Sequence, residues 1–179
     1  MSGQFLRIRL RFRRVLCLLL LPCFSFTAPA IFPQSKGPTP EDQLAQYKDK
    51  FDRDSDPIHK AKDLTKLGDA QIAEFTRQAT ADNIDGAFLT LAAYRVEVGS
   101  TFDAMKATGI DAERKPDGFK ELQIHLRKSV LKLERATSLV PPDRRKEFRE
   151  IHDELSSIDN ELFHMLFPRQ PGSKSSGEK

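Results

Sequence analysis

Cysteine is nearly absent from this 179-residue chain, and tryptophan is absent altogether. The two cysteines, Cys17 and Cys23, both lie within residues 1–30, so the chain beyond them carries no thiol. A domain without thiols forms no disulfide and has neither a cysteine nucleophile nor a cysteine-ligated zinc site. We therefore expect the chain after residue 30 to be held together by its apolar core alone.

Apolar runs long enough to span a membrane are also missing. The longest, residues 15–26, contains Pro22 and falls well short of the roughly 20 apolar residues that a spanning helix needs. Five arginines precede this run, and Ala28-Pro29-Ala30 follows it. This order of cationic, apolar and small residues is typical of a secretory signal peptide.

We predict that residues 1–30 are a signal peptide cleaved after Ala30, with no transmembrane anchor left after processing. The protein would then be exported, to the periplasm or the extracellular space. Arg13-Arg14 also fits a twin-arginine signal, although Phe12 stands where Ser or Thr is usual. The sequence leaves open whether export follows the general secretory or the twin-arginine route.

A strong excess of positive charge is missing once the signal peptide is set aside. The whole chain has 29 Lys and Arg against 26 Asp and Glu, but five of those cations lie in residues 1–30, which carry no acidic residue. The remainder has 24 basic and 26 acidic residues, a net charge of −2. Because nucleic-acid binding needs a strongly basic face, we expect no nucleic-acid partner.

Both ends of the processed chain have the composition of unpacked segments. Residues 31–40 are rich in proline and polar residues, which predicts a flexible linker. Residues 168–179 offer no apolar residue to bury, which predicts a disordered tail. The intervening residues 41–167 have the length of one domain with one core.

Apolar residues in 41–167 recur at the spacing of helices, not of strands. Thr39 is expected to cap a first helix whose apolar face holds Leu44, Tyr47 and Phe51. A second helical pattern starts at Asp56, and Gly68 is expected to break or cap it.

A third helix is expected from Asp82 or Asn83 to just before Gly109, and a fourth after the polar turn at 111–117. Ile124 and Leu131 form a second apolar stripe on the fourth helix, which predicts a second packing partner. Pro141-Pro142 should reverse the chain and open the last helix.

Long amphipathic helices joined by short turns predict an all-α, up-and-down antiparallel bundle of four to five helices. The expected core consists of Leu64, Leu67, Ile72, Phe75, Phe88, Leu91, Val98, Phe102, Phe119, Leu122, Leu126, Leu133, Phe148, Ile151, Leu155, Ile158 and Leu162.

Cations gather on both sides of the expected reversal at Pro141-Pro142. Those on the last helix stand at its beginning, the reverse of what the helix dipole favours. The turn should therefore concentrate positive charge at one end of the molecule, forming a surface that binds an acidic protein or an anionic envelope component. The alternative is an ordinary solvated surface neutralised by nearby glutamates. The candidate residues are Lys128, Lys132, Arg135, Arg144, Arg145, Lys146 and Arg149.

Two patterns raise the alternative of a metal site. Asp52, Asp54 and Asp56 alternate as in a calcium loop, but Pro57 stands where that loop needs glycine. The spacing of Glu161 and His164, three residues apart, is the one that ferritin-like bundles use, but such sites need a second copy and further carboxylates. We identify no metal ligand set and no cofactor.

No serine lies in the strained turn that exposes a catalytic nucleophile, so we expect the protein not to be an enzyme. The sequence favours a non-catalytic binding or interaction module of the bacterial cell envelope. The Leu44, Tyr47 and Phe51 stripe would be a further docking face if nothing covered it. The alternative function is a metal-binding helical bundle or metalloenzyme that uses histidine and carboxylate ligands.

Overall fold

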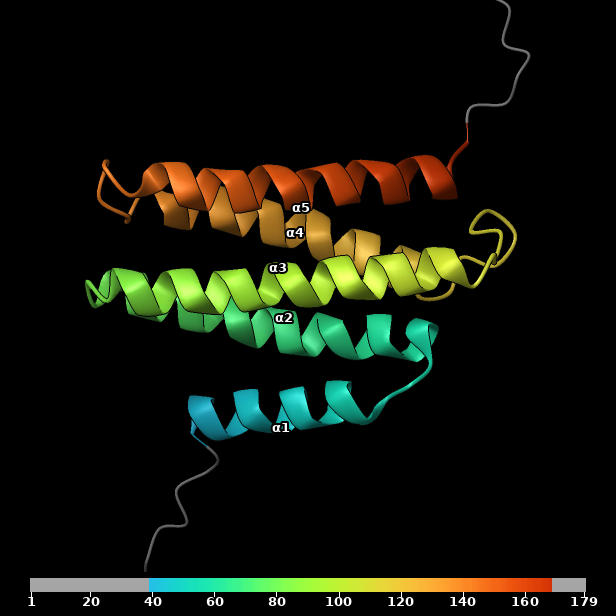
Figure 1. Ribbon diagram of the computed structural model, residues 1–179, viewed down its shortest axis with the longest axis horizontal. Coiled ribbons are helices and arrows are strands. Elements are labelled where there is room, and N and C mark those ends of the chain that lie inside the picture. The colour runs from blue at the N-terminus through green and yellow to red at the C-terminus, as the bar shows by residue number, and fades with distance from the viewer. Residues whose placement is uncertain (1–38, 169–179) are drawn as a thin grey trace, which may run out of the picture. The chain divides into compact units, whose positions relative to one another are not determined.

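A computed structural model describes residues 39–168 of the chain, and this part consists of five helices with no strand (Figure 1). The predicted all-α bundle is thereby confirmed. The expected signal peptide, residues 31–38 and residues 169–179 lie outside the described part. The helices are α1 (Pro40–Arg53), α2 (Pro57–Thr80), α3 (Ile84–Ala107), α4 (Phe119–Thr137) and α5 (Arg145–Leu166).

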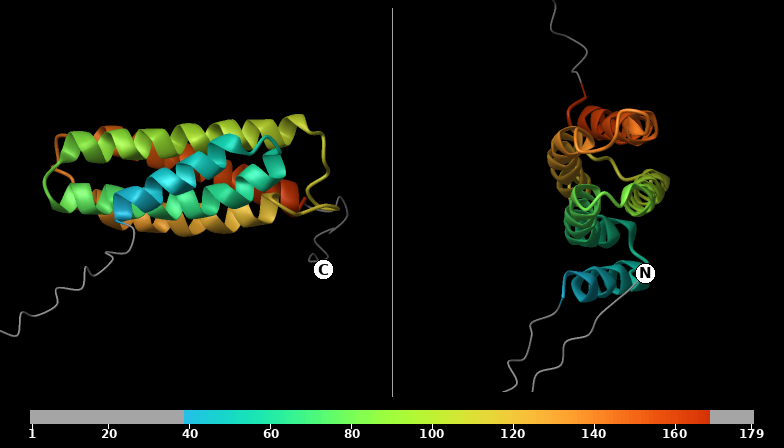
Figure 2. Two further views of the ribbon diagram at one scale, coloured as in Figure 1. Left: turned by 90° about the horizontal axis from the view of Figure 1, so that it is seen from below. Right: turned by 90° about the vertical axis from the view of Figure 1, so that its left-hand side faces the viewer.

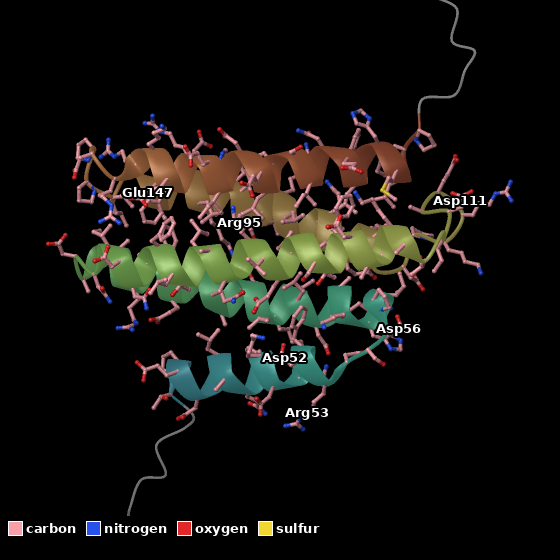
Figure 3. All side chains as sticks on the ribbon, in the orientation of Figure 1. Asp52, Arg53, Asp56, Arg95, Asp111 and Glu147 are labelled. Atoms are coloured by element: carbon pink, nitrogen blue, oxygen red, sulfur yellow. The ribbon has the colours of Figure 1, made fainter. Side chains whose placement is uncertain are left out.

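The beginnings of the first helices follow from local sequence signals. Thr39 and Asp42 form a reciprocal capping box at the start of α1, with Pro40 in the first helical position. The side chain of Asp56 accepts hydrogen bonds from the backbone N–H groups of Ile58 and His59 and so caps α2 (Figure 3). The capping hydrogen bonds lower the pKa of both aspartates below the usual value.

The four longer helices form two antiparallel hairpins, α2 with α3 and α4 with α5 (Figure 1). The hairpins stack with like orientation, so that α2 lies beside α4 and α3 beside α5 (Figure 2). Ion pairs between α3 and α5 show this register. They join Asp85 to Arg144, Arg95 to Glu154 and Lys106 to Glu161 in increasing order along both helices.

Helix α1 lies outside the ring of four helices and packs against α2 (Figures 1 and 2). Phe51 anchors α1, since its side chain is only 3% exposed. The Nζ atom of Lys60 on α2 lies 4.6 Å from the centroid of the Phe51 ring. Leu44 and Tyr47 are partly buried against the same core. The apolar stripe of α1 is therefore covered, and it is not the free docking face that it would be on an unpartnered helix.

The core lies between the two hairpins and contains most of the residues expected there. Every expected core residue is buried except Phe88 and Ile158, which are partly buried. The ring of Phe148 lies 5.9 Å from that of Phe75 and 5.6 Å from that of Phe88. Edge and tilted contacts of this kind stabilise aromatic pairs beyond the area they bury.

The expectation that Gly68 breaks or caps a helix is wrong, because α2 runs through it without interruption. A Cβ at this position would lie 2.4 Å from His125 Nε2 and 2.6 Å from Tyr94 Cε2. Glycine in a helix interior costs about 1 kcal/mol relative to alanine. Here it allows α2 to approach the buried rings of two other helices.

The expected second stripe of α4 has no packing partner among residues 39–168. Ile124 is 41% exposed and Leu131 is 54% exposed. Helix α4 does have two packing partners, α2 and α5, but the prediction that Ile124 and Leu131 provide the second contact was wrong, because both lie on the side that faces neither helix. Both residues remain as apolar positions on the outer surface of α4.

Candidate functional site

Six of the seven candidate cations lie on α4 or on the first turns of α5, and Arg144 is the last residue of the reversal at 138–144 that joins these helices. This reversal forms one end of the bundle (Figure 1). The cations do not form one continuous patch. Hydrogen bonds and ion pairs hold some of them, and others line two separate grooves.

Arg144 and Arg145 have structural contacts. Arg145 donates from Nε to the carbonyl of Val140 at 2.7 Å and from Nη2 to the carbonyl of Ser138 at 3.1 Å. Arg144, the residue just before α5, pairs with Asp85 on α3 at 3.1 Å and with Glu147 in the first turn of α5. These hydrogen bonds and charges raise the pKa of Arg144 above its usual value.

The contacts of Arg145 explain why a cation stands at the start of α5. The reversal places that position beside the C-terminal end of α4, where the partial charge of the helix is negative. The guanidinium therefore satisfies carbonyl groups that follow α4. The unfavourable dipole interaction with α5 is offset by a favourable one with α4.

Lys132 and Arg135 line a groove between α2 and α4, which we call the α2–α4 groove and which has a volume of about 590 Å³. Ile72 and Ala73 of α2 and Ala136 of α4 also line it. The two alanines have small side chains, and this leaves the groove hollow. Apolar side chains thus line a groove that carries cations along its α4 wall.

The edges of the α2–α4 groove are accessible. Lys132 Nζ lies 2.9 Å from Asp69 Oδ1, in a pair whose two side chains are 53% and 59% exposed. Leu139, at the end of the groove, is 49% exposed. Lys128 is exposed one helical turn before Lys132 and extends the cationic side of α4.

Arg145 and Arg149 line a second groove of about 420 Å³, the α4–α5 groove. His152 continues the same face of α5, and its Nδ1 lies 3.0 Å from Asp153 Oδ1. Glu134 of α4 lines the opposite wall. Carboxylates thus offset the cations of this groove, so it is less basic than the α2–α4 groove. Lys146 lies outside both, with a carboxylate oxygen of Glu150 3.9 Å away.

A polar cluster in the core was not found from the sequence. Tyr94 Oη on α3 lies 3.0 Å from His125 Nε2 on α4, and Ser129 Oγ lies 3.4 Å from the same nitrogen. Burial lowers the pKa of His125 to about 4 and raises that of Tyr94. His125 is therefore neutral at pH 7 and can accept a hydrogen bond from the Tyr94 hydroxyl. The sequence could have indicated that His125 is buried, because its spacing from Leu122 and Leu126 places it on the buried side of α4.

The carboxylates of the calcium-like pattern have other contacts. Asp52 pairs with Lys48, Asp54 accepts from the backbone N–H of Asp56, and Asp56 caps α2. Glu161 pairs with Lys106, and His164 is exposed beside Phe163. Within residues 39–168, no three histidine or carboxylate side chains converge in a way that could hold a metal ion.

Within the same residues, no helix has the length and apolar character needed to cross a membrane. The described residues therefore form a helical bundle with open grooves on its surface and a buried polar cluster in its core. Comparison with known protein families, with characterised proteins and with solved structures found no match to this chain.

Proposed function

We propose that this protein is a non-catalytic binding module of the bacterial cell envelope, and that its α2–α4 groove binds an acidic amphipathic helix of a partner protein. The observation that carries the proposal is the combination of apolar lining with a cationic wall in one groove. Ile72 and Ala136 supply the apolar surface, and Lys132 and Arg135 supply the charge.

Helix-in-groove recognition uses this combination of features. An amphipathic helix places its apolar face in a groove, and charges at the edge set its orientation and partner choice. A partner with Glu or Asp beside its apolar face would meet Arg135, which is exposed. A free anionic polymer or a lipid headgroup would use the cations but leave the apolar surface unused.

The existing pair between Lys132 and Asp69 presents little obstacle to binding. Both side chains are more than half exposed. Surface pairs of this kind contribute about 0–1 kcal/mol. A carboxylate of the partner can therefore replace Asp69 at a small cost.

The test uses a synthetic helical peptide with Leu on one face and Glu on the other. A scrambled peptide of the same composition serves as control. The double variant Lys132→Ser/Arg135→Ser should weaken binding of the helical peptide by about tenfold or more, since two charge-assisted contacts are lost. The matched variant Lys115→Ser/Lys120→Ser removes two exposed cations away from the groove and should bind normally.

Equal binding of the helical and scrambled peptides would contradict the proposal, and so would equal losses in the two double variants. Vesicles containing phosphatidylglycerol form a further arm of the experiment. Binding to these vesicles that is stronger than binding to the peptide, and that also depends on Lys132 and Arg135, would assign the surface to anionic lipid instead.

A further inference from the structure

A third groove lies between α1, α2 and α3, and we call it the α1 groove. Its volume is about 470 Å³, within the range typical of small-molecule sites. Helix α1 crosses the α2–α3 hairpin obliquely and forms one wall (Figure 2). Apolar side chains from all three helices line the groove, among them Leu44, Leu67, Leu89 and Ala93.

A buried carboxylate also lines the α1 groove. Glu97 is 7% exposed, and its Oε2 accepts a hydrogen bond of 2.7 Å from Gln71 Nε2. Gln71, itself 5% exposed, lines the same groove, and its Oε1 is buried without a hydrogen-bond partner among the described residues. Burial raises the pKa of Glu97 above its usual value.

The cation nearest to Glu97 is bound more closely to another carboxylate. Lys48 Nζ lies 3.5 Å from Glu97 Oε1 but 2.6 Å from Asp52 Oδ2. The Glu97 carboxylate is thus held in place by Gln71 and only loosely neutralised by Lys48. A buried carboxylate of this kind gains stability from a second cationic donor.

The charge of the α1 groove is opposite to that of the α2–α4 groove. Glu41, Glu74 and Glu97 line it, with Lys48 as the one lining cation among the described residues. Arg77 pairs with Glu74 at 2.6 Å and lies 3.8 Å from Glu41. The remaining negative charge is therefore concentrated at Glu97.

The apolar surface continues beyond the groove along the outer side of α3. Leu89 is 68% exposed and Val96 is 59% exposed. On α2, the lining residues run from Leu67 to Gln78, a distance of about 16 Å along the helix axis. The pair of Gln71 and Glu97 lies near the Leu67 end of this length, and Leu89 lies about 12 Å from Glu97 along α3. An extended apolar chain with a polar group at Glu97 matches this distance and this distribution of charge.

We infer that the α1 groove binds a cationic amphiphile, with its apolar chain against Ala93 and Leu89 and its protonated amine at the Glu97 carboxylate. Lys48 keeps its contact with Asp52 when the ligand is bound. The ligand class is a long-chain primary amine, recognised by its charge and by its chain. This site is separate from the α2–α4 groove and does not depend on the function proposed for that groove.

The test measures the binding of decylamine by calorimetry at concentrations where it is monomeric, with decanol and decanoate as probes of the same chain length. The protein should prefer decylamine to decanol by about tenfold, the value of one charge-assisted hydrogen bond. Glu97→Gln should abolish the preference for decylamine over decanol. The control Glu154→Gln removes an exposed carboxylate of α5 and should keep the preference.

A second measurement does not depend on the fold of the variant. In the unmodified protein, decylamine should shift the methyl resonances of Ala93 and Leu89 and leave those of Leu139 in place. Equal affinities for decylamine and decanol would overturn the inference. Tighter binding of decanoate would also overturn it, as would methyl shifts centred on Leu139.

Discussion

The Tyr94 hydroxyl lies 3.0 Å from Nε2 of His125, and this contact joins the two hairpins through the centre of the bundle. Tyr94 belongs to α3 and His125 to α4, two helices that lie on a diagonal of the ring rather than side by side. Gly68 of α2 provides the space for both rings. This buried hydrogen bond forms only when the two hairpins are packed together.

The first prediction concerns the pH dependence of stability. The pKa of His125 falls from the ordinary histidine value of 6.5 to about 4 in the folded protein, because burial disfavours the charged ring. As pH falls from about 6.5 to 4, the unfolded chain takes up a proton that the folded chain does not. His125 should therefore lower the free energy of unfolding by about 3 kcal/mol over this range and contribute no further change below it.

Urea unfolding between pH 4 and pH 8 checks this prediction. Asp69 favours the charged ring, and Lys128 and Lys132 oppose it, but burial is the largest effect. His125→Gln keeps a neutral polar side chain, so its stability should vary less with pH than that of the unmodified protein by this amount. His152→Gln, on the outer side of α5, is the control. The same pH profile in the unmodified protein and in His125→Gln would refute the assignment.

The second prediction compares two glycines within helices. Gly68→Ala places a methyl group against His125 and Tyr94, and overpacking of this kind costs about 1–3 kcal/mol. A Cβ at Gly99 meets nothing within 4 Å. Gly99→Ala should therefore stabilise the protein by up to about 1 kcal/mol through helix propensity. Thermal unfolding of both variants distinguishes the two effects, and equal shifts in melting temperature would contradict the close approach at Gly68.

The third prediction concerns the attachment of α1. Phe51→Ala removes its buried anchor, and truncation of a buried phenylalanine costs about 3–5 kcal/mol. Because α1 packs mainly on α2, the loss should free α1 while the other four helices stay folded. Hydrogen exchange should accelerate in residues 41–53 and stay slow in α2–α5. Fast exchange throughout the bundle would show instead that α1 is required for the whole fold.

The fourth prediction concerns Arg145, the first residue of α5. Arg145→Met keeps most of the side-chain volume but removes the donors to the carbonyls of Ser138 and Val140. The free energy of unfolding should fall by about 1 kcal/mol, since the site is partly exposed. Lys146→Met removes a neighbouring charge without such contacts and should change stability by less than 0.5 kcal/mol, the usual value for a surface site. Equal effects of the two variants in urea unfolding would rule out the capping role.

Local signals in the sequence predicted where the first three helices begin, whereas α5 begins at Arg145 and not at Pro141-Pro142. Thr39 and Asp56 cap helices through side-chain oxygens, and Asn83 does the same for α3. These contacts involve residues two or three apart in the chain, so the sequence contains the whole interaction. Gly68 was misread because its role depends on His125 and Tyr94, which lie far away in the sequence.

The candidate site was predicted less completely than the fold. The sequence located the cations, but the ion pairs of Lys132 with Asp69 and of Arg144 with Asp85 arise from the way the hairpins stack. Glu97 was missed because α3 has apolar residues on all its sides, and an isolated carboxylate on such a helix resembles a surface residue. Its burial depends on α1, whose packing the sequence pattern does not specify.

Helix α2 separates the α1 groove from the α2–α4 groove and forms one wall of each. Leu67 and Gln71 line the first groove, whereas Asp69 and Ala73 line the second, on alternate sides of the same helical turns. A sideways shift or a rotation of α2 therefore changes the dimensions of both grooves at once. Because α2 is the common wall, a change of its position or orientation cannot reshape one groove without reshaping the other.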